Sequence, residues 1–206
     1  MGFPVRTSLL GFLCALGLVA HATAGPLDEA RAAFKRHDYR TVVRIVRPLA
    51  SQGNAQAQYE LGAAYSLGMG VPHDDTMAAY WYKKAAEQDI SAAQSNIGVM
   101  YAHGRGVVRD DHLALFWLRK AAERGSPQAY ENLGSIYILS EPKDNFQSYI
   151  WYSLAVSAAS GFLHDMSARG REKAAAELTP AQIDEATRLA SQWAAQHPEV
   201  PDPPLF

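Results

Sequence analysis

The sequence predicts an all-α protein, built as an α-solenoid of antiparallel helix pairs. Three observations predict this class. Apolar residues recur at helical spacing through most of the chain. A block of about 36 residues repeats along it, which is typical of stacked helix pairs. No segment alternates apolar and polar residues as a half-buried strand does.

The composition excludes several classes of protein and of functional site. The chain has 206 residues, of which 48% are hydrophobic and 19% charged, with a formal net charge of −2 and one cysteine. This hydrophobic content excludes a globally disordered chain. The nearly balanced charge argues against nucleic acid as a partner, since that needs concentrated positive charge. A single cysteine excludes a disulfide scaffold and a cysteine-based zinc site.

Residues 1–24 have the pattern of a cleavable signal peptide. Arg6 precedes an apolar run from Ser8 to Ala20, and Ala22-Thr23-Ala24 then supplies a small-x-small cleavage site. We expect cleavage after Ala24 and a periplasmic or secreted protein; an uncleaved N-terminal anchor is the alternative. No later segment is long and apolar enough for a spanning helix of about 20 residues, so we expect that the mature chain does not span a membrane.

The elements follow in order from residue 25. Residues 25–52 form an N-terminal helix pair, with helices over 27–36 and 39–51. Two complete copies of the repeating block occupy 53–88 and 89–125, and a shortened third copy occupies 126–160. The recurring positions are Ala57, Ala93 and Ala129; Leu61, Ile97 and Leu133; Gly62, Gly98 and Gly134; Tyr65, Tyr101 and Tyr137; and Trp81, Trp117 and Trp151, the last of which comes two residues early.

Each copy reads as two helices joined by a glycine turn. The Gly-x-Gly-Val segments at 68–71 and 104–107 end the first helix, because glycine adopts positive φ. Asp74 and Asp110 are placed to cap the second helix. Aromatic and small residues then form its buried stripe, and a single pair cannot bury such a face alone.

The end of the chain extends the stack. Ser126-Pro127 opens the third copy as cap and first helical residue. Thr179-Pro180-Ala181-Gln182 is a capping box that begins a helix to residue 196, within capping helices over 161–196. Residues 197–206 hold four prolines, which predicts an extended tail without packed structure.

The repeated residues resemble the Sel1-like repeat (SLR) family of the tetratricopeptide-like superfamily. The family pattern, A-x-x-x-LG-x-x-Y-x-x-G-x-GV-x-x-D-x-x-x-A-x-x-W-x-x-x-AA, fits residues 53–125 closely and 126–158 in part. The terminal segments resemble those of exported bacterial members. The resemblance implies a non-catalytic adaptor or scaffold in the cell envelope that binds another protein, such as a periplasmic sensor domain, without a cofactor. An envelope hydrolase, β-lactamase-like or peptidoglycan-acting, is the alternative.

Candidate chemistry is sparse. Ser140 and Lys143 match an S-x-x-K nucleophile pattern, but Pro142 disfavours the helical turn that this mechanism needs. His103 and His112 bracket one turn without metal-ligand spacing. The glycine turns lack the Lys-Ser/Thr of a phosphate loop. We therefore predict no catalytic, cofactor-binding or metal-binding residue.

A partner-binding groove is predicted along the first helix of each pair, because such helices line the concave face of a helix-pair solenoid. If Ala57, Leu61 and Tyr65 point into the core, a second stripe faces away from it. That stripe comprises Tyr59, Ala63, Ser66, Leu67, Ser95, Val99, Ala102, His103, Glu131, Ser135, Ile138 and Leu139.

Four apolar members of this stripe, Leu67, Val99, Ile138 and Leu139, have no evident core role. They form a groove for a peptide or helix, or else they pack under neighbouring loops. If the groove is correct, charged substitutions at Val99 and Leu139 abolish partner capture and leave thermal stability intact.

Overall fold

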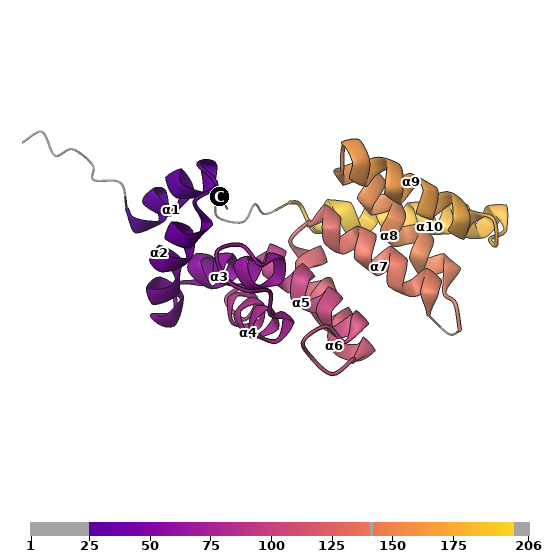
Figure 1. Cartoon of the computed structure of the whole chain (residues 1–206). Helices are drawn as coiled ribbons and strands as arrows, with labels where there is room; N and C mark the ends of the chain where they lie inside the picture. Colours follow the sequence, from indigo (N-terminus) through magenta and orange to yellow (C-terminus); the bar gives the residue numbers. More distant parts are fainter. Residues whose placement is uncertain (1–24, 141, 200–206) are drawn as a thin grey trace, which may run out of the picture.

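The computed structural model describes residues 25–140 and 142–199, and within them the chain forms ten α-helices and no strand (Figure 1). The all-α prediction is confirmed. The predicted signal peptide lies outside the described residues. The helices are α1 (Pro26–Lys35), α2 (Tyr39–Ser51), α3 (Ala55–Leu67), α4 (Asp75–Ala86), α5 (Ser91–His103), α6 (Asp111–Glu123), α7 (Pro127–Leu139), α8 (Asn145–Ala158), α9 (Gly161–Ala175) and α10 (Pro180–Gln196).

Sequential helices pack as antiparallel pairs, and each pair packs against the next. The pairs are α1–α2, α3–α4, α5–α6 and α7–α8, and they meet through α2 on α3, α4 on α5 and α6 on α7. The predicted stripes form the core, because the recurring alanine and leucine or isoleucine positions of α3, α5 and α7 are fully buried. The predicted core role of the three recurring tryptophans is confirmed as well, since each is buried.

Side-chain caps fix where the helices begin. Asp74 Oδ1 accepts a hydrogen bond from the backbone N–H of Met77 at 3.0 Å, and Asp110 caps α6 in the same way. The predicted caps Ser126 and Thr179 also accept from the third residue of their helices. These bonds satisfy backbone donors that a helix start leaves unpaired. The predicted helix starts at these caps are confirmed.

The two glycines of each turn have different tasks. The first, Gly68 or Gly104, ends its helix in the left-handed conformation, with φ of 68° and 66°. The second, Gly70 or Gly106, also has positive φ and lies directly on the preceding pair. A Cβ at Gly70 would collide with the carbonyl oxygen of Tyr39, the first residue of α2, and one at Gly106 with the equivalent oxygen at the start of α4. The second glycine therefore seats each loop on the helix pair before it.

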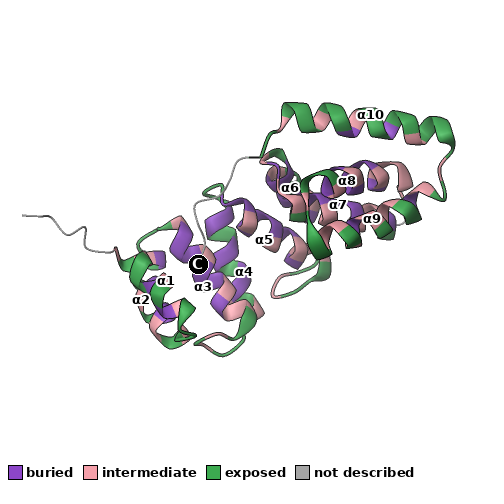
Figure 2. Ribbon diagram, turned by 90° about the horizontal axis from the view of Figure 1, so that it is seen from above, coloured by how far each residue is buried: buried purple, intermediate pink, exposed green. Residues whose placement is uncertain are grey.

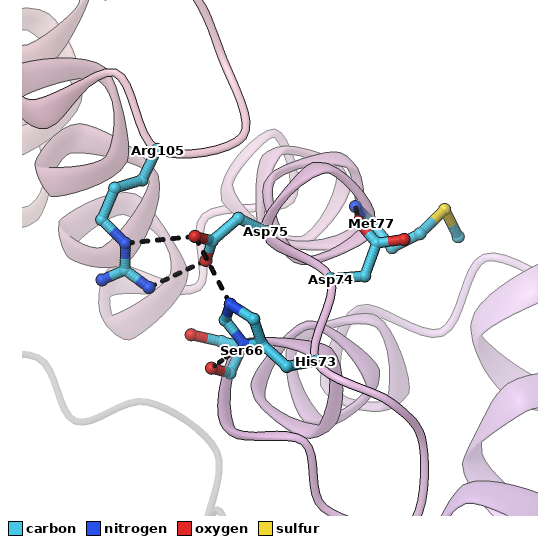
Figure 3. A network of polar contacts seen from close by, with 6 residues as sticks. All are labelled: Ser66, His73, Asp74, Asp75, Met77 and Arg105. Atoms are coloured by element: carbon cyan, nitrogen blue, oxygen red, sulfur yellow. Dashed lines mark hydrogen bonds and ion pairs between the residues drawn. The ribbon is translucent and has the colours of Figure 1, made fainter.

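Polar contacts reinforce the second of these junctions (Figure 3). Arg105, between the two glycines, donates from Nη2 to Asp75 Oδ1 at 2.8 Å. His73 Nε2 lies 3.6 Å from the other carboxylate oxygen, and its Nδ1 lies 2.9 Å from the carbonyl of Ser66. The hydrogen bond from Arg105 holds the pKa of the Asp75 carboxyl below its usual value. The α5–α6 loop is thus bound to α4 by a charged contact as well as by a close backbone approach.

The shortened third loop keeps the closing bond of the others. The backbone N–H of Asp144 donates to the carbonyl of Tyr137 at 3.0 Å, as Asp74 does to Tyr65 and Asp110 to Tyr101, both at 3.1 Å. The same pairing persists without the glycines. The α7–α8 pair therefore has the geometry of a repeat although its loop has a different sequence.

The last two helices complete the stack. α9 packs on α7 and α8, and α10 packs along α8 through buried Ala186 and Ala190. Figure 2 shows α10 as a helix that is exposed along most of its surface. None of the described helices combines the length and the apolar character that crossing a bilayer requires.

The expectation that the tail has no packed structure is wrong for His197 and Glu199. The His197 ring stacks on Trp193 with centroids 4.0 Å apart, and Trp193 in turn packs edge-on against Trp151. Glu199 lies against Gly125 in the α6–α7 loop. Proline content indicates a backbone preference, but it carries no information on long-range contacts. Residues 200–206 lie outside the described part of the chain.

Replacement of Gly106 by alanine tests the loop junction. Positive φ alone costs about 1–2 kcal/mol for a residue with a Cβ, and the collision with the start of α4 adds about 1–3 kcal/mol. Gly161→Ala is the matched control, since Gly161 also has positive φ (58°) but nothing lies within 4 Å of its Cβ position. Urea unfolding should show that Gly106→Ala loses clearly more stability than the control. Equal losses of unfolding free energy in the two variants would mean that the contact between the loop and the preceding pair does not stabilise the fold.

Candidate functional site

The predicted groove positions lie on α3, α5 and α7, and the structure brings them to one series of hollows. We call these the proximal, central and distal hollows, in the order of α3, α5 and α7, and together the groove. Tyr59 lines both the proximal and the central hollow, and Asn132 lines both the central and the distal one. Because neighbouring hollows share a wall residue, the three adjoin. Of the predicted residues, three line none of them: Ser66, Glu131 and Ile138.

The proximal hollow is mainly apolar and lies between the first helix pair and α3. Its volume is about 200 Å³. The lining residues are Phe34, Tyr39, Val42, Tyr59, Glu60, Ala63, Ala64, Leu67 and Met69. Leu67 is 63% exposed at its edge, as predicted for a groove residue. The carboxylate in the lining, Glu60, is buried and accepts a hydrogen bond from Gln56 Nε2 at 2.9 Å.

The central hollow is polar and larger, at about 460 Å³. Its lining comprises Tyr59, Ser91, Ala92, Ser95, Asn96, Arg124, Ser126, Pro127, Gln128, Asn132 and Glu199. The predicted residue Ser95 is only 4% exposed. The expectation that Ser95 offers open surface to a partner is therefore wrong.

The distal hollow, of about 370 Å³, lies between α5, the start of α6 and α7. Five predicted residues line it, namely Val99, Ala102, His103, Ser135 and Leu139. Leu139 is 70% exposed. Arg109 donates to the Asp111 carboxylate at 3.0 Å from both Nε and Nη2, and these bonds hold the pKa of Asp111 below its usual value. This end of the groove combines an exposed apolar side chain with fixed charges.

Two apolar residues of the predicted stripe are not open surface. Ile138 is 6% exposed, and half-buried Val99 packs against the core that α6, α7, α8 and α10 share. Val99 packs against a helical core and not under a loop, and the burial of Ile138 removes it from an open groove. A charge at Val99 would be partly buried and unpaired, so the substitution should destabilise the fold. The expectation that it leaves stability intact is corrected accordingly.

A polar cluster lies behind the distal hollow. Ser135 Oγ donates to Glu131 Oε1 at 2.9 Å and lies 3.0 Å from the Tyr152 hydroxyl. Burial raises the pKa of the Glu131 carboxyl and of the Tyr152 phenol. The cluster links α7 to α8 and fixes the position of Ser135 at the edge of the groove.

The candidate catalytic and metal residues are not arranged for chemistry. Ser140 follows α7 in an extended conformation, and its hydroxyl oxygen lies 2.9 Å from the carbonyl oxygen of Tyr137 and 3.0 Å from that of Pro142, either of which can accept its hydrogen. Lys143 is therefore not one helical turn from an open nucleophile. His103 lines the distal hollow, whereas His112 lines a separate one on α6. Within residues 25–140 and 142–199, no three His, Cys, Asp or Glu side chains converge as metal ligands.

A family model described as Sel1 repeat matches three consecutive segments, residues 55–90, 91–126 and 127–160. The chain belongs to the Sel1 repeat family. No curated protein matches it. The solved structure of a Sel1 repeat protein from Oxalobacter formigenes is 23% identical, with a TM-score of 0.63, and the match covers 89% of this chain and 78% of that one.

A second solved structure is c5321, a protective antigen present in uropathogenic Escherichia coli strains that displays an SLR fold. It is 23% identical with a TM-score of 0.57, and the match covers 85% of this chain and 47% of that one. The chain thus spans about half the length of the antigen. At these identities the likeness concerns the fold, and it confirms the predicted solenoid of helix pairs.

Sequence reasoning missed two buried glutamines, each of which joins a Sel1 repeat to the helix pair before it. Gln58 Nε2 donates to the carbonyl of Ala50 at 3.1 Å, and Gln94 Nε2 to that of Ala86 at 3.2 Å. Each carbonyl also accepts a backbone N–H from the turn that follows its helix, Gly53 or Asp89, so the amide adds a second hydrogen bond there. The signal was present, because the two glutamines occupy the same position in the first and second repeats. In the third repeat this position is Tyr130, which stacks on Trp151 instead.

Glu131→Gln tests the polar cluster behind the groove. A carboxyl with a raised folded-state pKa imposes no penalty while it is protonated, and it destabilises the fold as the pH rises through that pKa. The glutamine keeps an acceptor for Ser135 and cannot ionise. We expect it to raise the melting temperature at pH 7 by about 2 °C and to leave it unchanged near pH 4. Glu123→Gln, at an exposed site on α6, is the control. A melting temperature at pH 7 that is unchanged or lower in Glu131→Gln would contradict a penalty from the ionised carboxylate.

Proposed function

We propose that this protein is an exported interaction scaffold whose groove along α3, α5 and α7 binds another protein without catalysis. Sel1 repeat proteins generally mediate protein–protein interactions, and three such repeats form the middle of the chain. The observation that carries the proposal is the groove itself. Its three hollows adjoin, and an exposed leucine stands at each end, Leu67 at one and Leu139 at the other.

The lining indicates what kind of partner fits. The proximal hollow is mainly apolar, the central hollow polar, and the distal hollow carries both a leucine and the Arg109–Asp111 pair. An extended segment or a helix with apolar side chains at both ends and polar groups between them matches this order. Such recognition uses a few apolar anchors for affinity and the polar rim for specificity.

The proposed location is the bacterial periplasm or the extracellular space. Arg6, the apolar run that follows and Ala22-Thr23-Ala24 support cleavage after Ala24. Residues 25–206 contain no cysteine, which suits an oxidising compartment because no thiol can mispair. A periplasmic domain of a membrane sensor is one partner of the proposed kind.

Leu67→Asp and Leu139→Asp test the groove. Both side chains are mostly exposed, so the substitutions should change unfolding free energy by no more than about 0.5 kcal/mol. Phe162→Asp on α9 is the control, because Phe162 is 76% exposed and lines none of the three hollows. Tagged full-length proteins would be expressed at native level, cross-linked in the envelope and purified for mass spectrometry.

We expect the wild type and Phe162→Asp to recover the same partner in equal amounts. Each groove variant should recover at least tenfold less of that partner. Equal recovery by all four proteins would place the binding surface elsewhere. If the wild type enriches no protein over an untagged strain, the scaffold function itself is wrong.

A further inference from the structure

We propose that the groove has an occupant within the same chain. The C-terminal segment Val200–Phe206, which lies outside the described residues, binds in the proximal hollow as an intramolecular ligand. Binding of the segment in the hollow does not depend on the proposed function. Its regulatory consequence does rest on that function: a partner must displace this segment before it can bind at the proximal end of the groove.

The described part of the tail already enters the groove. After α10, His197 stacks on Trp193, and its Nδ1 lies 3.1 Å from the Trp193 carbonyl oxygen. Glu199 then lines the central hollow. A Cβ at Gly125, where φ is +77°, would lie 2.5 Å from Glu199 Cα. The tail backbone is thus in close contact with the α6–α7 loop, and Figure 1 shows this end of the described chain, in yellow, near the beginning of α7.

The remaining residues are long enough to reach the proximal hollow. Tyr59 is a wall of both the central hollow, where Glu199 lies, and the proximal one. A proline-rich segment in the polyproline II conformation advances about 3.1 Å per residue, so seven residues extend about 20 Å. That is about the length of a 13-residue helix such as α3. The segment is therefore long enough to extend from Glu199 in the central hollow past Tyr59 into the proximal hollow.

The chemistry of the segment suits this hollow. It reads Val-Pro-Asp-Pro-Pro-Leu-Phe, with three prolines that restrict φ and so reduce the entropy lost on binding. Aromatic-lined grooves are the usual receptors for such segments, and Phe34, Tyr39 and Tyr59 line the proximal hollow. Leu205 and Phe206 supply apolar side chains for the rest of the lining. Because the tether gives the segment an effective concentration in the millimolar range, even modest intrinsic affinity keeps the hollow occupied.

Photo-cross-linking of the full chain tests the occupancy directly. Benzoylphenylalanine in place of Phe206 should form cross-links within one molecule, mapped by mass spectrometry to proximal-hollow residues such as Ala63, Leu67 and Met69. The same group in place of Phe162 is the control and should give none there. Cross-links from position 206 that are scattered over the surface, or that join two molecules, would overturn the proposal.

A peptide added in trans gives an independent test that needs no external partner. A fluorescein-labelled peptide with the sequence of residues 199–206 should bind the full-length L205D/F206D variant at least tenfold more tightly than the wild type, whose hollow is filled. Adding L67D to that variant should abolish binding. Equal binding to the wild type and to L205D/F206D, or binding to neither, would contradict the proposal. Failure to capture a partner from the envelope would bear on the proposed function alone.

Discussion

The structure depends on the seating of each repeat loop on the helix pair before it. A single pair has an apolar face that it cannot bury, so its stability requires a neighbour at a fixed distance. The second glycine of the turn provides this distance, because its missing Cβ lets the loop backbone meet the first residue of α2 or α4. The buried glutamines complete the junction at the opposite end of the same helices. Stacking in this protein is therefore specified by backbone contacts as much as by apolar area.

The groove is a consequence of that stacking. When successive pairs are held in register, α3, α5 and α7 follow one another, and the three hollows lie along them. The third repeat lacks the glycine turn, yet the bond between Asp144 and Tyr137 closes its loop. α9 and α10 then cover the last pair. The end of α10 returns the chain to the α6–α7 loop, so the fold itself directs the tail toward the surface that the repeats create.

The period of the sequence was enough to predict the fold class, the helix starts at Asp74 and Asp110, and the burial of the tryptophans, because each of these follows from local spacing. It also located Leu67 and Leu139 as exposed residues. The sequence did not predict the burial of Ser95 and left that of Ile138 open, because burial depends on how closely neighbouring helices approach, which the pattern of a single helix does not contain. The contacts of the tail were not predicted for a related reason. Composition indicates a backbone preference, whereas the packing of Glu199 on Gly125 joins residues far apart in sequence.

Hydrogen–deuterium exchange on the full chain, compared between the wild type and Gly106→Ala, tests the central claim most directly. If the loop seating couples neighbouring repeats, the substitution should accelerate exchange across α3 to α6, on both sides of the junction, while α9 retains its protection. Acceleration confined to the loop between α5 and α6 would contradict the account, because it would show that each pair is stable without the contact.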